Sequence, residues 1–176
     1  FSVVDINPTA AATLFPVSTK GNTLTIRKFA RKPWTITDFI ENRTLNLETS
    51  AFLWLCIQYE LNMIIAGGTS SGKTSLLNSL MPFIQPNHRI ISIEDTRELQ
   101  LPDFLHWVPL TTRQPNPEGK GSVDMLDLMI NSLRMRPDRI IVGEIRKADQ
   151  AEVLFEAMLT GHSVYATLHA DTVDQV

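Results

Sequence analysis

One segment near the middle of the chain, NMIIAGGTSSGKTSLLNSL at 62–80, restricts the fold more than any other. A short apolar run leads into a turn rich in glycine and serine, and a stretch with helical spacing of apolar residues follows. Gly67, Gly72, Lys73 and Thr74 fit the spacing G-x-x-x-x-G-K-[ST]. That spacing is specific only between a buried strand and a helix, and both conditions are met here. The segment therefore predicts an α/β fold.

The same order of apolar strand, loop and helix repeats along the rest of the chain. Apolar strands that alternate with helices indicate a mainly parallel sheet with helices on both faces. We expect Ser122 to begin the helix 122–136, and Thr49 or Ser50 to begin the helix 48–61. The expected strands are 23–29, 62–67, 89–95, 106–112, 138–144 and 163–168, and the expected helices are 37–42, 48–61, 73–83, 122–136 and 149–161.

The composition argues against several classes of protein. The net charge of −3 argues against bulk binding to nucleic acid. Cys56 is the only cysteine, so an internal disulfide is excluded, a reducing cytoplasm fits, and a small buried side chain is expected there. No run reaches the ~18 apolar residues of a membrane helix. The chain begins at FSVVDINP and ends in mid-pattern at TVDQV, and we expect it to be part of a longer protein.

The glycine-rich loop has the chemistry of phosphate binding. Glycine lets the chain bend back so that successive backbone N–H groups point at phosphate oxygens, and the following helix adds the positive end of its dipole. The Lys73 ammonium can reach the β- and γ-phosphates, and the Thr74 hydroxyl can ligate Mg²⁺. The sequence thus predicts a nucleotide with Mg²⁺ at this loop. The predicted binding residues are Gly67, Gly68, Thr69, Ser70, Ser71, Gly72, Lys73, Thr74 and Ser75.

Acidic residues follow two of the apolar strands at the carboxyl end, where open parallel sheets bind their ligands. Glu94 and Asp95 end one strand, and the sequence does not choose between them as the carboxylate that orients the attacking water. Glu144 ends another strand. Its alternative role is to cap a helix, but its place beside an apolar strand favours the magnesium shell.

Arginine often completes the positive charge at a site for phosphate transfer. Arg97, directly after the acidic pair, and Arg113, before a loop rich in proline and glycine, are candidates. Arg134, Arg136 and Arg139 lie around the end of a predicted helix. Complementarity to the negative end of the helix dipole is the simpler explanation for these three residues.

Two histidines flank the last predicted strand. His162 and His169 are seven positions apart, which is about 23 Å along an extended chain at roughly 3.3 Å per residue. An odd spacing also directs the two side chains to opposite faces of a strand. Although histidine is a common metal ligand, the strand therefore prevents this pair from sharing one metal ion.

The motifs GGTSSGKT, IISIEDTREL, RMRPDRIIVGEIR and TGHSVYATLHAD follow one another in this order, and with them the chain resembles the secretion ATPase superfamily. Members power type II and type IV secretion, assembly of type IV pili and the archaeal flagellar motor. The segments TLTIRKF and LPDFLHWVPLTTR are most similar to the archaeal branch. The resemblance covers residues 18–176 and implies a RecA-like motor domain that hydrolyses ATP with Mg²⁺.

The resemblance also implies roles for individual residues. GGTSSGKT is similar to the Walker A motif, Glu94 and Asp95 match the aspartate box, and Glu144 in VGEIR matches an atypical Walker B motif. His162 and His169 match the histidine box and are expected to sense the γ-phosphate and the subunit contact. In this family arginines, some of them from the N-terminal domain, also reach the nucleotide. The matching positions are Arg27, Arg31, Arg97 and Arg113.

The resemblance further implies a domain organisation and an assembly. Residues 1–32 would be the C-terminal part of an N-terminal domain plus linker, and residues 33–176 a motor domain that is incomplete at its C-terminal end. The segment ARKPW at 30–34 breaks the strand pattern at this boundary. We also expect a homo-hexamer, peripheral to the cytoplasmic face of the membrane and bound to a membrane platform protein, without nucleic acid.

Other classes of P-loop protein remain alternatives. A RecA-like nucleic-acid translocase is the main one, but the acidic charge and the lack of interleaved aromatic and basic residues count against it. A GTPase switch normally carries an N-K-x-D motif, which the sequence lacks. A metabolic kinase would need a recognisable acceptor site, which the sequence lacks, and the two-domain layout also argues against a kinase. The sequence therefore favours the ATP-hydrolysing motor of a secretion, pilus-like or flagellum-like machine.

Overall fold

The chain forms two compact units in the computed structural model, Phe1–Lys32 and Pro33–Val176. The structure describes residues 9–27, 32–170 and 172. The division falls within the segment 30–34, where the sequence pattern breaks. That the first unit is the end of a separate N-terminal domain stays a prediction.

The first unit contains an antiparallel hairpin. Strand β1 (Thr9–Thr13) pairs with β2 (Thr23–Arg27) in the register that opposes Thr9 to Arg27. The strand predicted at 23–29 is confirmed over residues 23–27, and the rest of that prediction lies outside the described residues.

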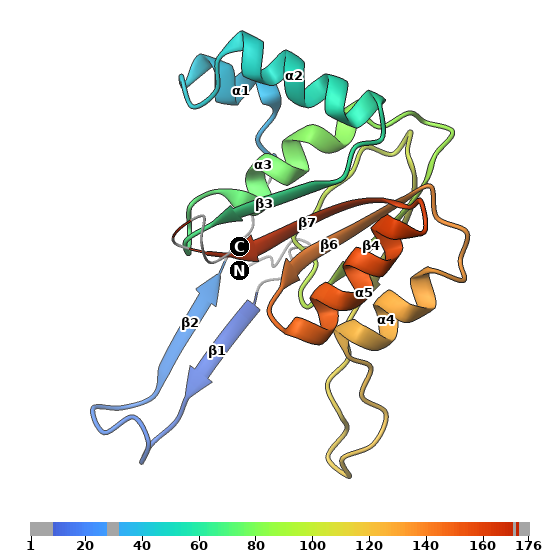
Figure 1. Ribbon diagram of the computed structural model, residues 1–176. Coiled ribbons are helices and arrows are strands. Elements are labelled where there is room, and N and C mark those ends of the chain that lie inside the picture. The colour runs from blue at the N-terminus through green and yellow to red at the C-terminus, as the bar shows by residue number, and fades with distance from the viewer. Residues whose placement is uncertain (1–8, 28–31, 171, 173–176) are drawn as a thin grey trace. The chain divides into compact units, whose positions relative to one another are not determined.

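The second unit is built on a parallel sheet of five strands (Figure 1). Its order is β3-β7-β6-β4-β5, and every neighbouring pair runs parallel. The strands are β3 (Met63–Gly67), β4 (Arg89–Glu94), β5 (His106–Thr111), β6 (Arg139–Ile145) and β7 (Ser163–His169). The predicted α/β class with a mainly parallel sheet is confirmed, and β3, which leads into the glycine-rich loop, lies at one edge.

Helices cover both faces of this sheet (Figure 1). Helix α3 lies with α1 and α2 on one face, and α4 packs beside α5 on the other. The helices are α1 (Ile36–Glu41), α2 (Leu47–Gln58), α3 (Lys73–Leu80), α4 (Met125–Ser132) and α5 (Ala148–Leu159).

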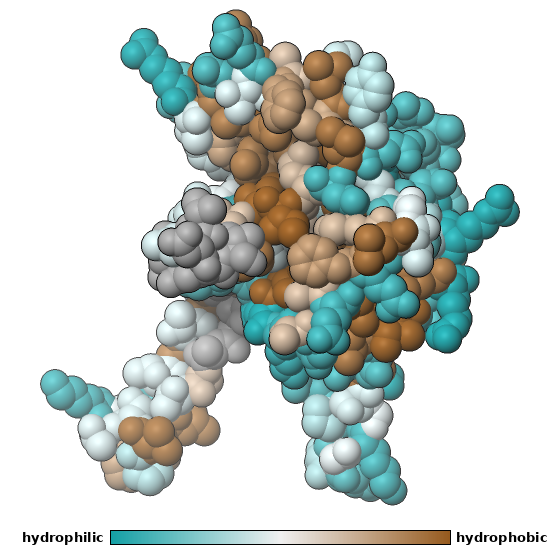
Figure 2. Space-filling view, viewed as in Figure 1, coloured by the Kyte–Doolittle hydropathy of each residue, from teal (hydrophilic) through white to brown (hydrophobic). Residues whose placement is uncertain are grey.

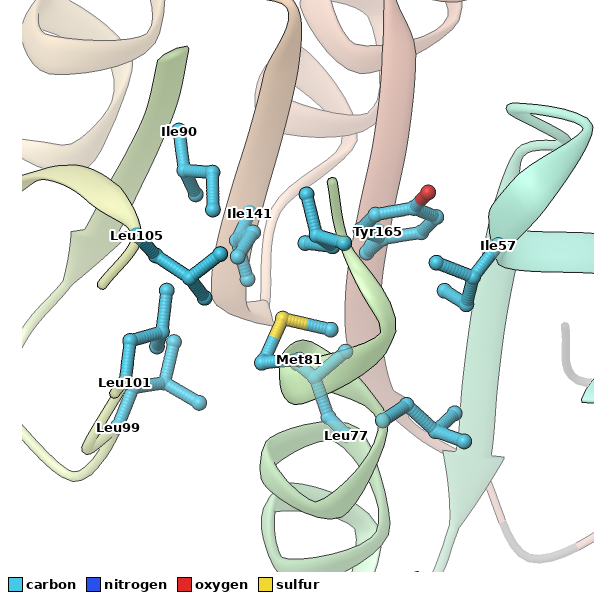
Figure 3. Close-up of a cluster of buried hydrophobic side chains, with 11 residues drawn as sticks. Ile57, Leu77, Met81, Ile90, Leu99, Leu101, Leu105, Ile141 and Tyr165 are labelled. Atoms are coloured by element: carbon cyan, nitrogen blue, oxygen red, sulfur yellow. The ribbon is translucent and has the colours of Figure 1, made fainter. Parts of the chain in front are cut away.

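Alternate residues of the central strands enter two separate cores. In β4, Ile90 belongs to the core beneath α3, and Ile91 belongs to the core beneath α4 and α5. In β6, Ile141 and Ile140 alternate in the same way. This period of two follows from strand geometry, and burying each isoleucine fully contributes about 1.5–3 kcal/mol. Figure 3 shows the first core, in which α3 and the sheet meet side chains of the segment 99–105.

Helix α2 begins earlier than the sequence predicted. The Asn46 side chain accepts the backbone N–H of Thr49 at 2.7 Å, so Asn46 is the N-cap and Leu47 the first helical residue. Thr49 and Ser50 therefore lie inside the first turn. The prediction that one of them begins the helix was wrong, because an asparagine three residues upstream provides the same cap.

Helix α4 begins after Asp124 rather than at Ser122. Asp124 and Asp127 form a capping box, in which each side chain accepts the backbone N–H of the other residue. The preceding residue, Val123, is joined to Arg113 by backbone hydrogen bonds in both directions at 2.9 Å. This bridge holds the start of the predicted helix in an extended conformation, which the helical periodicity alone did not reveal.

Helix α2 is apolar on its exposed side as well as on its buried side. Cys56 is a small buried side chain, as predicted, and lies beside the fully buried Ile57. Figure 2 shows apolar side chains gathered over the part of the molecule that α1 and α2 form. The large exposed apolar residues of α2 and its C-cap are Leu47, Phe52, Trp54, Leu55 and Tyr59. Of the helices described, none is long and apolar enough to cross a membrane.

Candidate functional site

The glycine-rich loop joins β3 to α3 and bends sharply. A side chain on Gly67, the last residue of β3, would lie 2.7 Å from the Ser71 hydroxyl oxygen and would displace it. Ser70 has a φ of 60° and Gly72 a φ of 92°, both in the left-handed region. Gly72 is also the N-cap of α3. The bend therefore brings the positive end of the helix into the loop.

Lys73, the first residue of α3, points back into the loop. Its ammonium donates to the carbonyl oxygen of Gly67 at 2.8 Å and to that of Gly68 at 2.7 Å. Phosphate oxygens could replace these carbonyls. The Thr74 hydroxyl has no hydrogen-bond partner among the described residues, so it is available to a metal ion. These residues fit a nucleotide phosphate chain with its Mg²⁺.

The parallel strands bring the acidic residues to the same end of the sheet as the loop, the carboxyl end of the strands. β3 and β7 pair Gly67 with His169, so the loop begins beside the end of β7. Glu144 and Ile145 end β6, and Glu94 ends β4. β6 is two strands from β3, which is roughly 10 Å at about 4.8 Å per strand. A phosphate chain and its metal shell can span this distance.

Glu144 lies in a β-bulge. The pairing of β6 with β7 is regular up to Val142 and resumes at Ile145, with one extra residue in β6. A side chain on Gly143 would lie 3.0 Å from Cγ of Glu94, so glycine permits the close approach of β6 and β4 at this point. Bulges commonly re-aim a side chain beside an active site. This bulge takes Glu144 out of the regular alternation of the strand.

Arg146 links Glu144 to Asp95. Its Nη1 lies 2.6 Å from Oδ2 of Asp95, and its Nη2 lies 2.6 Å from Oε2 of Glu144. Its Nε donates to the same Glu144 oxygen at 2.6 Å. The hydrogen bond with Glu144 raises the pKa of the Arg146 guanidinium above its ordinary value, which keeps it charged. The three side chains form an acidic cluster with a single cation at its centre.

Glu94 and Asp95 lie in different surroundings, which the sequence did not reveal. Glu94 is 3% exposed, and its Oε1 accepts the backbone N–H groups of Glu98 at 2.9 Å and Leu99 at 3.0 Å. Burial raises the pKa of the Glu94 carboxyl, and Oε2 is without a hydrogen-bond partner in the described part of the chain. Asp95 is exposed and pairs with Arg146. Glu94 therefore anchors the turn after β4, whereas Asp95 belongs to the acidic cluster.

Glu94→Gln tests the buried carboxyl. Because burial raises its pKa, the folded protein holds the Glu94 proton more tightly than the unfolded chain does. The free energy of unfolding therefore falls as pH rises from about 4.5 through the raised pKa of the folded carboxyl. Glutamine has no such proton. We expect the variant to gain stability over wild type across this range, by about 1.4 kcal/mol for each pKa unit of difference.

Denaturant unfolding between about pH 4 and about pH 8 measures this gain. Below the ordinary glutamate pKa of 4.5 the difference between variant and wild type should not change with pH. Glu118→Gln, at an exposed position, is the control and should show no trend. A difference for Glu94→Gln that is equally flat would contradict the assignment.

Arg97 and Arg113 lie beside β5, the outer strand of the sheet on the side opposite β3. The Arg97 guanidinium stacks 4.6 Å from the ring centre of Trp107 in β5. The Nε of Arg113 donates to the Gly121 carbonyl at 2.7 Å and helps to close the loop 113–123. β5 is four strands from β3, roughly 19 Å. Neither arginine is brought to the glycine-rich loop, and their role toward a nucleotide stays a prediction.

The two histidines lie at opposite ends of β7. His169 is the last residue of β7 and pairs with Gly67, so it lies at the carboxyl end of the sheet, where the loop begins. His162 precedes the strand, and its Nδ1 lies 3.2 Å from Oγ1 of Thr160 and 3.3 Å from the Ala157 carbonyl oxygen. Within the chain the structure brings His169, but not His162, to the candidate site. The predicted role of His162 at a subunit contact is untested.

Arg27 and Arg31 precede the second unit. Arg27 ends β2, but its side chain is not described, and Arg31 lies outside the described residues. Their predicted contacts with the nucleotide therefore stay predictions.

Arg139 is not a charge at a helix end, in contrast to the interpretation from the sequence. It is 0% exposed at the start of β6, and its Nη1 donates to the Ser163 hydroxyl at 2.7 Å and to the Tyr165 hydroxyl at 2.9 Å. Its Nη2 donates to the Ile57 carbonyl at 3.2 Å. Arg139 thus joins α2 to β6 and β7 at the amino end of β6, the end of the sheet opposite the glycine-rich loop. The exposed arginines of this segment are Arg134 and Arg136.

Two residues of the site were not predicted from the sequence. Arg146 follows Glu144 by two positions in VGEIR, a spacing that places both on one side of a strand, but no partner was assigned to it. Gly143 interrupts an apolar strand, which is a common sign of a bulge. Together these signals would have indicated a re-aimed Glu144 with a cation beside it.

Known proteins are similar to this chain in sequence or in fold. The sequence profile of the family described as type II/IV secretion system proteins matches residues 9–176. The chain is 47% identical over 157 residues to the uncharacterized protein MJ0900 of Methanocaldococcus jannaschii. It is 41% identical over 125 residues to the protein VirB11 of Agrobacterium fabrum. Among solved structures it is similar to the Legionella pneumophila ATPase DotB, with a TM-score of 0.67 and 25% sequence identity.

The chain spans only part of each of these proteins. The alignment with MJ0900 covers 89% of this chain and 28% of the relative, and that with VirB11 covers 70% and 36%. The similarity to DotB covers 96% of this chain and 44% of the solved chain. The likeness therefore concerns one region of longer proteins.

Proposed function

The chain belongs to the type II/IV secretion system protein family, and on that premise we propose that it is the nucleotide-hydrolysing core of an ATP-driven motor. Its RecA-like fold is shared with DotB, which is described as an ATPase. The motor couples ATP hydrolysis to protein export or to the assembly of a pilus-like or flagellum-like filament.

The observation that supports this proposal most strongly is that the loop and the acidic cluster lie at the same end of the sheet, the carboxyl end of its strands. Lys73 and the available Thr74 hydroxyl lie beside β3, and Glu144 lies at the end of β6. Hydrolysis of a phosphoanhydride bond needs a cation on the phosphates, a ligand for Mg²⁺ and a carboxylate near the attacking water. Lys73, Thr74 and Glu144 are the candidates for these three tasks.

Each residue has one task in the proposed reaction. The backbone N–H groups of the loop and the Lys73 ammonium bind the β- and γ-phosphates, and the Thr74 hydroxyl holds Mg²⁺. Magnesium, when bound, neutralises charge on the phosphate oxygens. The sequence favoured the magnesium shell for Glu144 and gave the attacking water to Glu94 or Asp95. Because Glu94 holds the turn after β4 and Asp95 pairs with Arg146, we instead assign the water to Glu144, which accepts a hydrogen bond from it and orients it in line with the γ-phosphate. Asp95 supports Glu144 through Arg146.

The proposal extends to the assembly. The chain acts in a homo-hexameric ring on the cytoplasmic face of the membrane and engages a membrane platform protein. The ring would explain why Arg97, Arg113 and His162 are not brought to the loop within the described part of the chain, because a neighbouring subunit would supply them. Arg27 and Arg31 would reach the nucleotide from the N-terminal domain.

The test is steady-state ATP hydrolysis by the full-length protein with and without Mg²⁺, beside Glu144→Gln. We expect Mg²⁺-dependent hydrolysis by wild type and a loss of about 10²- to 10⁴-fold in kcat for the variant, with ATP still bound. Glu118→Gln removes the same charge from an exposed loop and should keep the wild-type rate. A wild type that binds ATP but hydrolyses none in any assembly state would refute the proposal.

A further inference from the structure

Arg146 contacts both carboxylates of the acidic cluster in a fixed geometry. Its guanidinium lies 2.6 Å from Oδ2 of Asp95 and 2.6 Å from Oε2 of Glu144. Its backbone N–H donates to Oε1 of Gln150 at 3.0 Å, at the start of α5, and Gln150 is 7% exposed. A planar guanidinium is the side chain that can hold two carboxylates at once, and here its backbone is anchored as well.

The two contacts with Glu144 end on the same oxygen. Nε and Nη2 of Arg146 both lie 2.6 Å from Oε2. Oε1 has no bonding partner among the residues that the structure describes. Arg146 therefore divides the carboxylate into one oxygen that is held and one that is available to water.

Arg146 also lowers the repulsion within the cluster. Asp95 and Glu144, which carry the same charge, lie at the carboxyl ends of the neighbouring strands β4 and β6, and neighbouring strands are roughly 4.8 Å apart. Two like charges at such a spacing repel each other unless a cation lies between them. Without that cation, we expect Glu144 to turn away from Asp95.

We propose that Arg146 is a positioning residue, which fixes Glu144 through Oε2 so that Oε1 orients the attacking water. The inference rests on the proposed function, because that water is the one consumed in ATP hydrolysis. Arg146 acts through Glu144 and makes no contact with the phosphates. Nucleotide affinity is therefore independent of Arg146, whereas the rate of hydrolysis depends on it.

Arg146→Gln and Arg146→Lys in the full-length protein test this inference. For Arg146→Gln we expect kcat to fall about 10- to 100-fold, while the affinity for ATP stays within about twofold of wild type. Arg146→Lys should have an intermediate kcat, because an ammonium supplies the charge without the planar fork. Lys147→Gln removes an adjacent exposed charge and should leave both quantities unchanged.

A double variant shows whether Arg146 acts through Glu144. Glu144→Gln/Arg146→Gln should be no slower than Glu144→Gln alone, within about twofold, because residues that act as a unit are not additive. Losses that multiply, or weaker ATP binding by Arg146→Gln, would mean that Arg146 contacts the phosphates and would overturn the inference.

The inference and the proposed function can fail separately. If wild type hydrolyses ATP and Arg146→Gln does so at the same rate, the motor stands and the inference fails. If wild type hydrolyses no ATP, both fail.

The cluster is exposed to solvent, so removing its ion pairs should hardly change the thermal midpoint of unfolding. A rate loss that accompanies a large drop in that midpoint would indicate a structural role and would also overturn the inference.

Discussion

We expect Lys73→Ala to lower kcat/KM for ATP by about 10²- to 10³-fold, with much of the loss in nucleotide binding. The Lys73 ammonium already lies inside the loop, 2.8 Å from the Gly67 carbonyl oxygen and 2.7 Å from that of Gly68. We expect phosphate oxygens to take the place of these carbonyls when nucleotide binds. Equilibrium binding of a fluorescent ATP analogue, together with steady-state hydrolysis, measures both parts of the loss.

Two further variants make this prediction specific. Lys120→Ala removes the same charge from the exposed loop 113–123 and should behave as wild type. Lys73→Arg should also lose activity, because a broad planar guanidinium does not reproduce the compact ammonium that contacts the Gly67 and Gly68 carbonyl oxygens together. Binding by Lys73→Ala that equals wild type would show that the loop does not hold the phosphates.

The strands of the sheet could be predicted because their pattern is local. β4 and β6 are buried on both faces, so continuous apolar runs such as RIISI and RIIV identify them without knowledge of their neighbours. The prediction placed these strands at 89–95 and 138–144, and they lie at Arg89–Glu94 and Arg139–Ile145. The order of the strands does not follow from such runs, since any of them could occupy the centre of a parallel sheet.

Helix starts were harder to predict because several residues compete for each cap. Asn46, Thr49 and Ser50 can all accept a backbone N–H, and only the conformation of the chain before the helix decides between them. The same holds for Ser122 and Asp124, where the bridge between Val123 and Arg113 decides. That bridge joins residues ten positions apart in the sequence, so the local periodicity of apolar residues cannot predict it.

The candidate site likewise has one part that local sequence predicts and one part that depends on distant contacts. The residues of the glycine-rich loop are contiguous, so their spacing identifies them directly. The acidic cluster combines the ends of β4 and β6, and its geometry depends on the order of the sheet. For this reason the sequence treated Glu94 and Asp95 as equivalent and assigned no partner to Arg146. In the structure Glu94 is buried and Asp95 is exposed, and Arg146 forms ion pairs with Asp95 and Glu144.

Arg139→Ala should reduce the free energy of unfolding by about 3–5 kcal/mol, because it removes a large, fully buried side chain and the donor to several buried acceptors. Arg139 is fully buried and also lies 3.6 Å from Oε1 of Glu60. The substitution leaves the Ser163 hydroxyl and the Ile57 carbonyl without their buried donor and creates a cavity between α2 and the sheet. Denaturant unfolding of variant and wild type under identical conditions measures the loss.

Arg134→Ala is the matched control, because Arg134 belongs to the same segment but is exposed, and its effect should stay within about 0.5 kcal/mol. Arg139→Met should fall between the two, since methionine restores much of the lost volume but none of the hydrogen bonds. A loss below about 1 kcal/mol for Arg139→Ala would place this arginine among surface charges. The interpretation from the sequence would then be right for all three arginines of the segment, and the junction of α2 with β6 and β7 would need another explanation.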